Sequence, residues 1–116
     1  MAIKIYGIKN CDTMKKAFTW LDNHGIAYTF HDYKKLGIDE STIKQWLQEF
    51  DIDQLINTKG TTFKKLDEVS QKEALSNPTG IKLMMAYTSM IKRPIVVAGK
   101  RLLLGFDAAN WEKELG

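Results

Sequence analysis

The chain has 116 residues, 44% of them apolar, which is enough to bury the core of one domain. Its 17 basic and 14 acidic side chains leave a formal net charge of +3, and the basic residues are scattered rather than clustered as on a nucleic-acid-binding face. There is no apolar run of the roughly 18 residues that a membrane span needs and no signal-peptide pattern at the start, so we expect a cytoplasmic protein that binds neither nucleic acid directly nor a membrane.

The first third of the chain predicts a strand, a helix and a second strand. Residues 3–7 alternate apolar and polar side chains and end at a glycine, which is typical of a short strand. Residues 10–24 predict a helix, because apolar side chains recur there at helical spacing: Met14, Ala17, Phe18 and Leu21. Residues 27–31 predict the second strand, so the segment fits a βαβ unit.

The middle of the chain, at about 37–90, is predicted to be helical. Asp39 or Ser41 can cap a first helix that reaches Phe50, and short helices are expected around 54–56 and 62–66. Ser70 and Glu73 fit a capping box. Pro78 then suits the first position of a helix, whose methionine-rich stripe we interpret as core: Ile81, Leu83, Met84, Met85 and Tyr87.

The end of the chain predicts a hairpin and a final helix. Strands are expected at 94–97 and 101–104, with a short turn between them, and Asp107 can cap a helix that reaches Leu115. The whole order predicts one α/β domain, residues 1–116. Its mixed sheet should have about four strands, and a helical region at about 37–90 is inserted into it.

The chain has one cysteine, Cys11, at the predicted start of the first helix. A single cysteine excludes an intrachain disulfide, which agrees with a reducing compartment, and it excludes a cysteine-rich zinc site. His24 and His31 lie in no cluster of ligand residues, so we expect structural histidines and no metal site. Because the first turn of a helix has free N–H groups and a partial positive charge, it should favour the Cys11 thiolate over the thiol.

The alternative interpretation is that Cys11 is a small, inert, buried side chain. Its neighbours Asn10, Asp12 and Thr13 are polar, which argues against a place deep in the core. Asp12 or Thr13 could also serve only to cap the helix.

Arg93 and Pro94 form a second point of interest, because a proline that opens a strand after a loop can be cis. In a thioredoxin-type fold such a proline faces the cysteine and leaves the backbone of the preceding residue free to pair with a substrate. From these residues alone, an ordinary trans proline at a strand start is favoured.

Three segments together resemble the arsenate reductase (ArsC)-like family, and the likeness runs nearly from end to end. Residues 6–17, YGIKNCDTMKKA, resemble its active-site segment; residues 56–63, INTKGTTF, resemble its middle motif; and residues 91–97, IKRPIVV, resemble its late motif, which residues 101–106 follow as expected. The nearest branch is the YffB group, beside the Spx/MgsR group.

This resemblance implies a thioredoxin-like fold with an inserted helical region. It also implies that Cys11 is the nucleophile, that Pro94 is cis, and that Arg93 and Lys59 face the cysteine. An arginine there would hold an oxyanion or a carboxylate through two parallel hydrogen bonds. Asn10, Asp12 and Thr13 complete the expected substrate site, which lies beside the cysteine.

Two departures from the family pattern bear on the activity. Arsenate reductases of this type use three arginines around the cysteine, whereas this chain has Arg93, Lys59 and, at the third position, Leu104. Lys59 keeps the charge but loses the fork of donors, and Leu104 cannot bind an oxyanion. Met14 stands where the Spx group usually has a second cysteine, which excludes an internal redox switch.

We therefore expect a monomeric thiol-disulfide reductase with one nucleophilic cysteine. Since the chain has no second cysteine, an outside thiol must release the mixed disulfide. The resemblance implies glutathione as co-substrate and glutaredoxin as a partner. One alternative is an arsenate reductase coupled to glutathione and glutaredoxin. Another, of a different class, is an Spx-like regulator that binds RNA polymerase.

Overall fold

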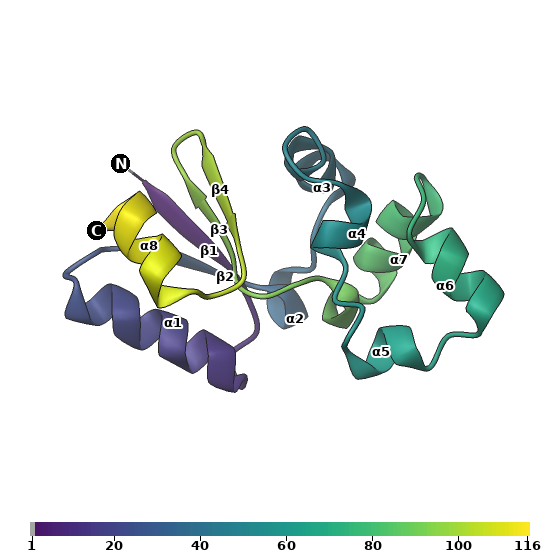
Figure 1. Cartoon of the computed structure of the whole chain (residues 1–116), viewed down its shortest axis with the longest axis horizontal. Coiled ribbons are helices and arrows are strands. Elements are labelled where there is room, and N and C mark those ends of the chain that lie inside the picture. The colour runs from purple at the N-terminus through teal and green to yellow at the C-terminus, as the bar shows by residue number, and fades with distance from the viewer. Residues whose placement is uncertain (1) are drawn as a thin grey trace. The chain divides into compact units, whose positions relative to one another are not determined.

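The computed structural model describes residues 2–116 (Figure 1). The chain divides into two compact units: one comprises the described residues up to Tyr33 together with Arg93–Gly116, and the other comprises Lys34–Lys92. The helical segment expected at about 37–90 falls inside the second unit, and the interpretation of residues 1–116 as one domain stays a prediction. Between residues 2 and 116, no helix has the length and apolar character that crossing a bilayer requires.

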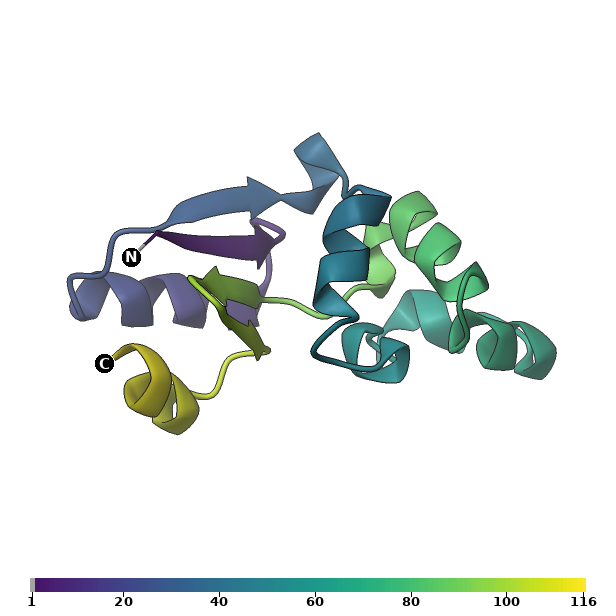
Figure 2. The same cartoon turned by 90° about the horizontal axis from the view of Figure 1, so that it is seen from above.

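The first unit is a four-stranded mixed sheet with two helices (Figures 1 and 2). Its elements in chain order are β1 (Ile3–Gly7), α1 (Asp12–Asn23), β2 (Thr29–Asp32), β3 (Ile95–Ala98), β4 (Arg101–Leu104) and α8 (Ala108–Leu115). The strand order is β2-β1-β3-β4, with β1 parallel to β2 and antiparallel to β3, and β4 antiparallel to β3. This is the α/β, thioredoxin-like arrangement that the sequence predicted.

One row of side chains across this sheet forms the core with both helices. Ile5 pairs with Phe30 on one side and with Val96 on the other, and Val96 pairs in turn with Leu103. The buried core cluster consists of Ile5, Met14, Ala17, Leu21, Val96, Leu103 and Trp111. Because successive side chains of a strand point to opposite faces, α1 and α8 cover one face of the sheet, while Tyr6 points to the other.

Helix α1 begins later than the sequence predicted, at Asp12, with Cys11 as its N-cap residue. Met14 is fully buried under the end of β1, and a Cβ at Gly7 would overlap its thioether. Glycine at the end of the strand therefore lets the first turn of α1 pack closely beneath the sheet. This packing sets where the residue before the helix, Cys11, is held.

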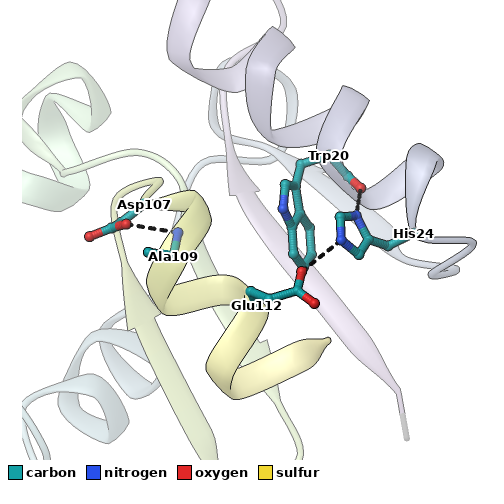
Figure 3. Close-up of polar contacts among 5 residues, drawn as sticks. All are labelled: Trp20, His24, Asp107, Ala109 and Glu112. Atoms are coloured by element: carbon teal, nitrogen blue, oxygen red, sulfur yellow. Dashed lines mark hydrogen bonds and ion pairs between the residues drawn. The ribbon is translucent and has the colours of Figure 1, made fainter.

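Asp107 caps helix α8, as the sequence predicted. Its Oδ1 accepts a hydrogen bond from the backbone N–H group of Ala109 at 3.0 Å (Figure 3). It also accepts one from the backbone N–H group of Asn110 at 3.3 Å. These two donors would otherwise lack an intrahelical acceptor. The cap therefore holds the start of the helix that carries the buried Trp111.

The substitution Asp107→Ala is expected to lower the free energy of unfolding by about 0.5–2 kcal/mol, because it removes this acceptor. The measurement is urea unfolding followed by far-UV circular dichroism. Asp107→Asn is the matched control, since asparagine also caps well, and it should stay close to the wild type. Equal stabilities of the alanine variant and the wild type would contradict the assigned cap.

The second unit is helical. Its elements are α2 (Tyr33–Leu36, of which Tyr33 belongs to the first unit), α3 (Glu40–Trp46), α4 (Ile52–Leu55), α5 (Thr61–Lys64), α6 (Glu68–Ala74), α7 (Thr79–Ala86) and the 3-10 helix η1 (Thr88–Met90). Of the two predicted caps, Asp39 is the one used: its carboxylate accepts the Thr42 N–H at 2.8 Å.

Two local predictions in this unit were wrong. The capping box at Ser70 and Glu73 does not start a helix, because α6 begins earlier and Asp67 caps it by accepting the Ser70 N–H at 2.7 Å. Pro78 is the N-cap of α7 rather than its first residue, and its peptide bond with Asn77 is cis.

The methionine-rich stripe of α7 is only partly core. Ile81 and Met84 are buried, but Met85 is 41% exposed and Tyr87 is 56% exposed. The helix ends at Ala86, one residue before Tyr87, so the helical spacing that suggested a continuous stripe does not reach the tyrosine.

Candidate active site

Cys11 lies at the amino end of α1, in the loop that follows β1. It is half-buried and takes no part in a disulfide. Its backbone is extended, and its carbonyl accepts the first helical hydrogen bond, from the N–H of Lys15 at 2.9 Å. The residue is therefore the N-cap, the position whose side chain lies next to the free N–H groups of the first turn.

The pKa of the Cys11 thiol is below its ordinary value. Burial acts against this by raising the pKa, but hydrogen bonds to the sulfur outweigh it: the strongest comes from the backbone N–H of Met14, followed by those from the Arg93 side chain and the Thr13 N–H. The positive charge of Arg93 lowers the pKa further. The site thus favours the thiolate, which is the nucleophilic form of cysteine.

Arg93 and Pro94 reach this site from the other end of the chain. They immediately precede β3, the antiparallel neighbour of β1, so the sheet brings them to the edge where Cys11 follows β1. The Arg93–Pro94 peptide bond is cis, as the family resemblance implied and contrary to what the residues alone favoured. The Pro94 carbonyl accepts a hydrogen bond from the Gly105 N–H at 2.8 Å, which ties the proline to the end of β4.

The polar neighbours of Cys11 do not cap the helix. Asp12 and Thr13 are exposed residues of the first turn, one and two positions beyond the N-cap, so the alternative in which one of them is the cap was wrong. The Thr13 contribution to the site is its backbone N–H. Asn10 is exposed in the loop before Cys11. Their side chains remain available to a ligand, and their role as substrate contacts stays a prediction.

Leu104, at the position of the third family arginine, is the last residue of β4. It pairs with Ile95, the residue that follows Pro94, and is half-buried. A leucine at this position offers no donor for an oxyanion, so the cationic side chain that the first unit places against Cys11 is Arg93.

Lys59 belongs to the second unit and is exposed in the loop between α4 and α5. Backbone contacts tie that loop to the segment before Arg93. Ile56 and Ile91 form an antiparallel bridge, and the Lys92 N–H donates to the Leu55 carbonyl at 2.8 Å. Backbone contacts therefore connect the middle motif, residues 56–63, with the start of the late motif, residues 91–97. That Lys59 faces the cysteine stays a prediction.

Tyr33 is a buried residue near Arg93 that the sequence analysis missed. Burial raises the pKa of its hydroxyl well above 10; the neighbouring Tyr6 hydroxyl adds to this, and Arg93 opposes it. Within residues 2–116 no hydrogen-bond partner is found for that hydroxyl. The tyrosine directly follows β2, and the carboxyl ends of the parallel strands β1 and β2 meet at the same edge of the sheet. The position of Tyr33 just after the predicted second strand could therefore have indicated that it lies near the active site.

Both histidines lie against aromatic side chains. His24 stacks on Trp20, with ring centroids 3.8 Å apart, and the His31 ring lies 4.8 Å from that of Tyr6. Among the described residues 2–116, no group of three or more His, Cys, Asp or Glu side chains is arranged to hold a metal ion.

His24 joins α1 to α8 through both ring nitrogens (Figure 3). Nδ1 lies 2.8 Å from the Trp20 carbonyl oxygen and Nε2 lies 2.8 Å from Glu112 Oε2. Both partners are acceptors, so the ring satisfies both only when doubly protonated. The Trp20 carbonyl is the largest cause that raises the pKa of His24, and Glu112 adds to it.

A pH dependence of stability follows from this contact. Since folding raises the pKa of His24, its contribution is complete below the unfolded pKa of about 6.5 and is lost as the pH rises through the folded value. Melting temperatures of the wild type and His24→Gln should therefore differ most at about pH 5.5 and converge at about pH 8.5. A difference that does not change with pH would rule out the charged pair.

Comparison with known proteins agrees with this geometry. Residues 6–114 match the sequence profile of the ArsC family. An uncharacterised protein of Haemophilus influenzae is 38% identical over 110 residues, covering 95% of this chain and 96% of the relative. The global transcriptional regulator Spx of Streptococcus pneumoniae is 26% identical over 107 residues, covering 90% of this chain and 79% of the regulator.

Two solved structures are similar over nearly the whole chain. The YFFB protein is 47% identical with a TM-score of 0.93, and the alignment covers 99% of this chain and 100% of that protein. An arsenate reductase (ArsC)-related protein of Brucella melitensis is 48% identical with a TM-score of 0.79, covering 97% and 93% of the two chains. The profile match spans most of the chain, and the protein belongs to the ArsC family.

Proposed function

We propose that this protein is a glutathione-dependent thiol-disulfide reductase in which Cys11 is the only nucleophile. The observation that carries the proposal is the surroundings of the sulfur. Two backbone N–H groups of α1 and the Arg93 guanidinium donate hydrogen bonds to it and lower its pKa. Membership of the ArsC family supports thiol redox chemistry as the type of reaction.

The proposed cycle has three exchange steps. The Cys11 thiolate attacks one sulfur of a substrate disulfide, so a Cys11–substrate disulfide forms and the other substrate sulfur leaves as a thiolate, which takes up a proton. A glutathione thiolate then attacks the Cys11 sulfur of the mixed disulfide, so the second substrate sulfur leaves as a thiol and a Cys11–glutathione disulfide forms. A second glutathione attacks the glutathione sulfur of that disulfide, which gives oxidised glutathione and frees the Cys11 thiolate. In sum, one disulfide and two glutathione molecules give two substrate thiols and one oxidised glutathione, and Cys11 is regenerated.

The residues around Cys11 supply binding groups for such a substrate. A carboxylate of glutathione would pair with Arg93, and its peptide backbone would pair with residue 93 beside the cis Pro94. Asn10, Asp12 and Thr13, exposed at the start of α1, would contact the part of the ligand nearest the sulfur.

The test is mass spectrometry of the intact protein after incubation with oxidised glutathione. We expect one glutathionyl adduct on the wild type and none on Cys11→Ser, and we expect added reduced glutathione to remove the adduct. A small thiol of ordinary pKa, treated in parallel, shows that the reagent is active. If that control thiol forms its mixed disulfide while Cys11 forms none, the proposed function is wrong.

Arsenate reduction is the second candidate, favoured by the similarity to an arsenate reductase-related protein. Leu104 argues against it, because an oxyanion would lose one of its three expected cationic partners. A steady-state arsenate assay coupled to NADPH oxidation through glutathione and glutaredoxin separates the two. Arsenate-dependent turnover would favour this candidate over the disulfide reductase.

A regulator that binds RNA polymerase is the third candidate, because the relatives named Spx share 26–29% identity with this chain. Met14 argues against redox control of such binding. It occupies the position expected for a second cysteine, and it is fully buried against Gly7. A pull-down with the C-terminal domain of the polymerase alpha subunit tests this candidate, and we expect no retention.

A further inference from the structure

The first unit has an open hollow of about 360 Å³ along one side of α1. It lies between successive turns of the helix and the loop that joins β4 to α8. Its lining consists of Lys15, Lys16, Thr19, Trp20, Asn23 and Phe106. None of these residues has a role in the chemistry proposed for Cys11.

The hollow begins next to the candidate active site. The Lys15 N–H donates to the Cys11 carbonyl, so the hollow starts one helical turn, about 5.4 Å, beyond the N-cap. On its other side, Phe106 follows Gly105, whose N–H donates to the Pro94 carbonyl at 2.8 Å. Backbone hydrogen bonds therefore connect both sides of the hollow to the candidate active site, one side to Cys11 and the other to Pro94.

Two aromatic rings form the apolar walls, and both are held in place from behind. Trp20 and Phe106 each pack edge-on against the fully buried Trp111, with ring centroids 5.5 and 4.8 Å apart. Trp20 is also stacked on His24, which is fastened to Glu112 (Figure 3). Because these rings are half-buried and braced, little side-chain entropy would be lost on binding a partner.

The charge at the rim is positive and uncompensated. Lys15 and Lys16 are exposed on α1, and within residues 2–116 neither ammonium group has an ion-pair partner. The neighbouring Glu112 is already paired with His24. A ligand with carboxylates would therefore find two available cations beside an aromatic surface.

We propose that this hollow binds an acidic, aromatic-containing peptide segment of the protein whose disulfide Cys11 reduces. That the peptide belongs to a disulfide substrate rests on the proposed function. That a peptide binds here rests on the aromatic walls and the two lysines of the hollow. A small molecule would be poorly enclosed by so open a surface, since ligand pockets usually bury most of their ligand. A peptide needs only one apolar side chain between Trp20 and Phe106, with carboxylates near the two lysines.

The test uses full-length Cys11→Ser, which has no thiol, so that binding is separated from disulfide chemistry. The probe is an acetylated peptide with a central phenylalanine flanked by glutamates, and its counterpart has lysines in place of the glutamates. Binding is measured by ¹⁵N–¹H NMR titration. We expect the glutamate peptide to shift the indole N–H of Trp20 and the amides of Lys15 and Phe106, and the lysine peptide to shift none of them.

Charge reversal provides the matched comparison. In the Cys11→Ser background, Lys15→Glu with Lys16→Glu should weaken binding of the glutamate peptide about tenfold or more. Lys64→Glu with Lys65→Glu, an exposed pair on and beside α5, changes the net charge equally and should alter binding less than about twofold. If the first double variant does not keep a native spectrum, Lys15→Gln with Lys16→Gln takes its place.

Three results would overturn the inference: no shift at Trp20 with the glutamate peptide, equal binding of the two peptides, or an equal loss in both double variants. None of them depends on whether Cys11 accepts glutathione. If Cys11 forms the glutathionyl adduct but no peptide binds, the proposed reductase function stands and the docking surface is rejected. If the peptide binds but Cys11 forms no adduct, the docking surface stands and the proposed reductase function is rejected.

Discussion

Replacing Arg93 with alanine is expected to slow alkylation of Cys11 by iodoacetamide roughly tenfold at pH values below the thiol pKa of the wild type. The guanidinium donates a hydrogen bond to the sulfur and lowers the thiol pKa through its charge. A hydrogen bond to a charged group contributes about 1.5–3 kcal/mol, and about 1.4 kcal/mol corresponds to a factor of ten. At a pH below the thiol pKa, the rate follows the fraction of thiolate, so losing this stabilisation reduces the rate directly.

The sign of the effect should change with pH. As the pKa rises in Arg93→Ala, the midpoint of the rate profile moves to higher pH. Above both pKa values the sulfur is a thiolate in either protein, and the more basic thiolate of the variant is the better nucleophile. The profiles should therefore cross at high pH, which a change in access to the sulfur alone would not produce.

Two substitutions complete this experiment. Arg93→Lys keeps the charge but not the planar fork, so its profile should lie between those of the wild type and the alanine variant. Arg101→Ala is the matched control. Arg101 lies in β4 and forms an ion pair with Glu114 at 3.2 Å, so the Cys11 profile should not move. A wild-type profile in Arg93→Ala would remove Arg93 from the active site.

The substitution Trp111→Ala is expected to lower the free energy of unfolding by about 3–5 kcal/mol. Trp111 is fully buried in the core cluster of the sheet and both helices. The rings of Trp20 and Phe106 pack edge-on against it, and its indole N–H donates to the Gly105 carbonyl at 3.2 Å. Alanine would leave a cavity and a lost hydrogen bond at the point where α8 meets the sheet.

Urea unfolding followed by far-UV circular dichroism measures this loss, and the melting temperature should fall by about 10–20 °C. Trp111→Phe is the companion variant, because it keeps a ring in the core and loses only part of the volume and the hydrogen bond. It should be destabilised by less than the alanine variant, and it keeps the prediction measurable if Trp111→Ala does not fold. A loss below about 1 kcal/mol for the alanine variant would contradict the assigned packing.

Much of the fold was predictable because the signals are local. Strand β1 begins and ends where the alternation of side chains placed it, strand β4 has the predicted bounds, and Asp107 caps the last helix as expected. The capping box predicted at Ser70 failed because Asp67, three residues earlier, caps the helix instead and accepts the Ser70 N–H. When two capping patterns overlap in the sequence, the sequence does not show which of them starts the helix, because that depends on how the helix packs.

The candidate site was predictable in part. The position of Cys11 between a strand and a helix indicated a sulfur near free N–H groups, and the N-cap geometry agrees with it. The place of Arg93 beside Cys11 was known only through family resemblance, since no periodicity relates residues so far apart in the chain. Tyr33 has no local signal of a place in the site, because it reaches the edge beside Arg93 only through the parallel pairing of β1 and β2.

Local patterns were enough to predict the order of strands and helices and the placement of the cysteine at a helix start. These features depend on side-chain periodicity, glycine and capping, which act within a few residues. The contact of Arg93 with the sulfur, and the packing of Trp20 and Phe106 on Trp111, exist only in the folded chain. Such contacts arise when β3 pairs with β1 and when α8 packs on the sheet, and the register of those pairings is set by burial of the whole core rather than by any local pattern.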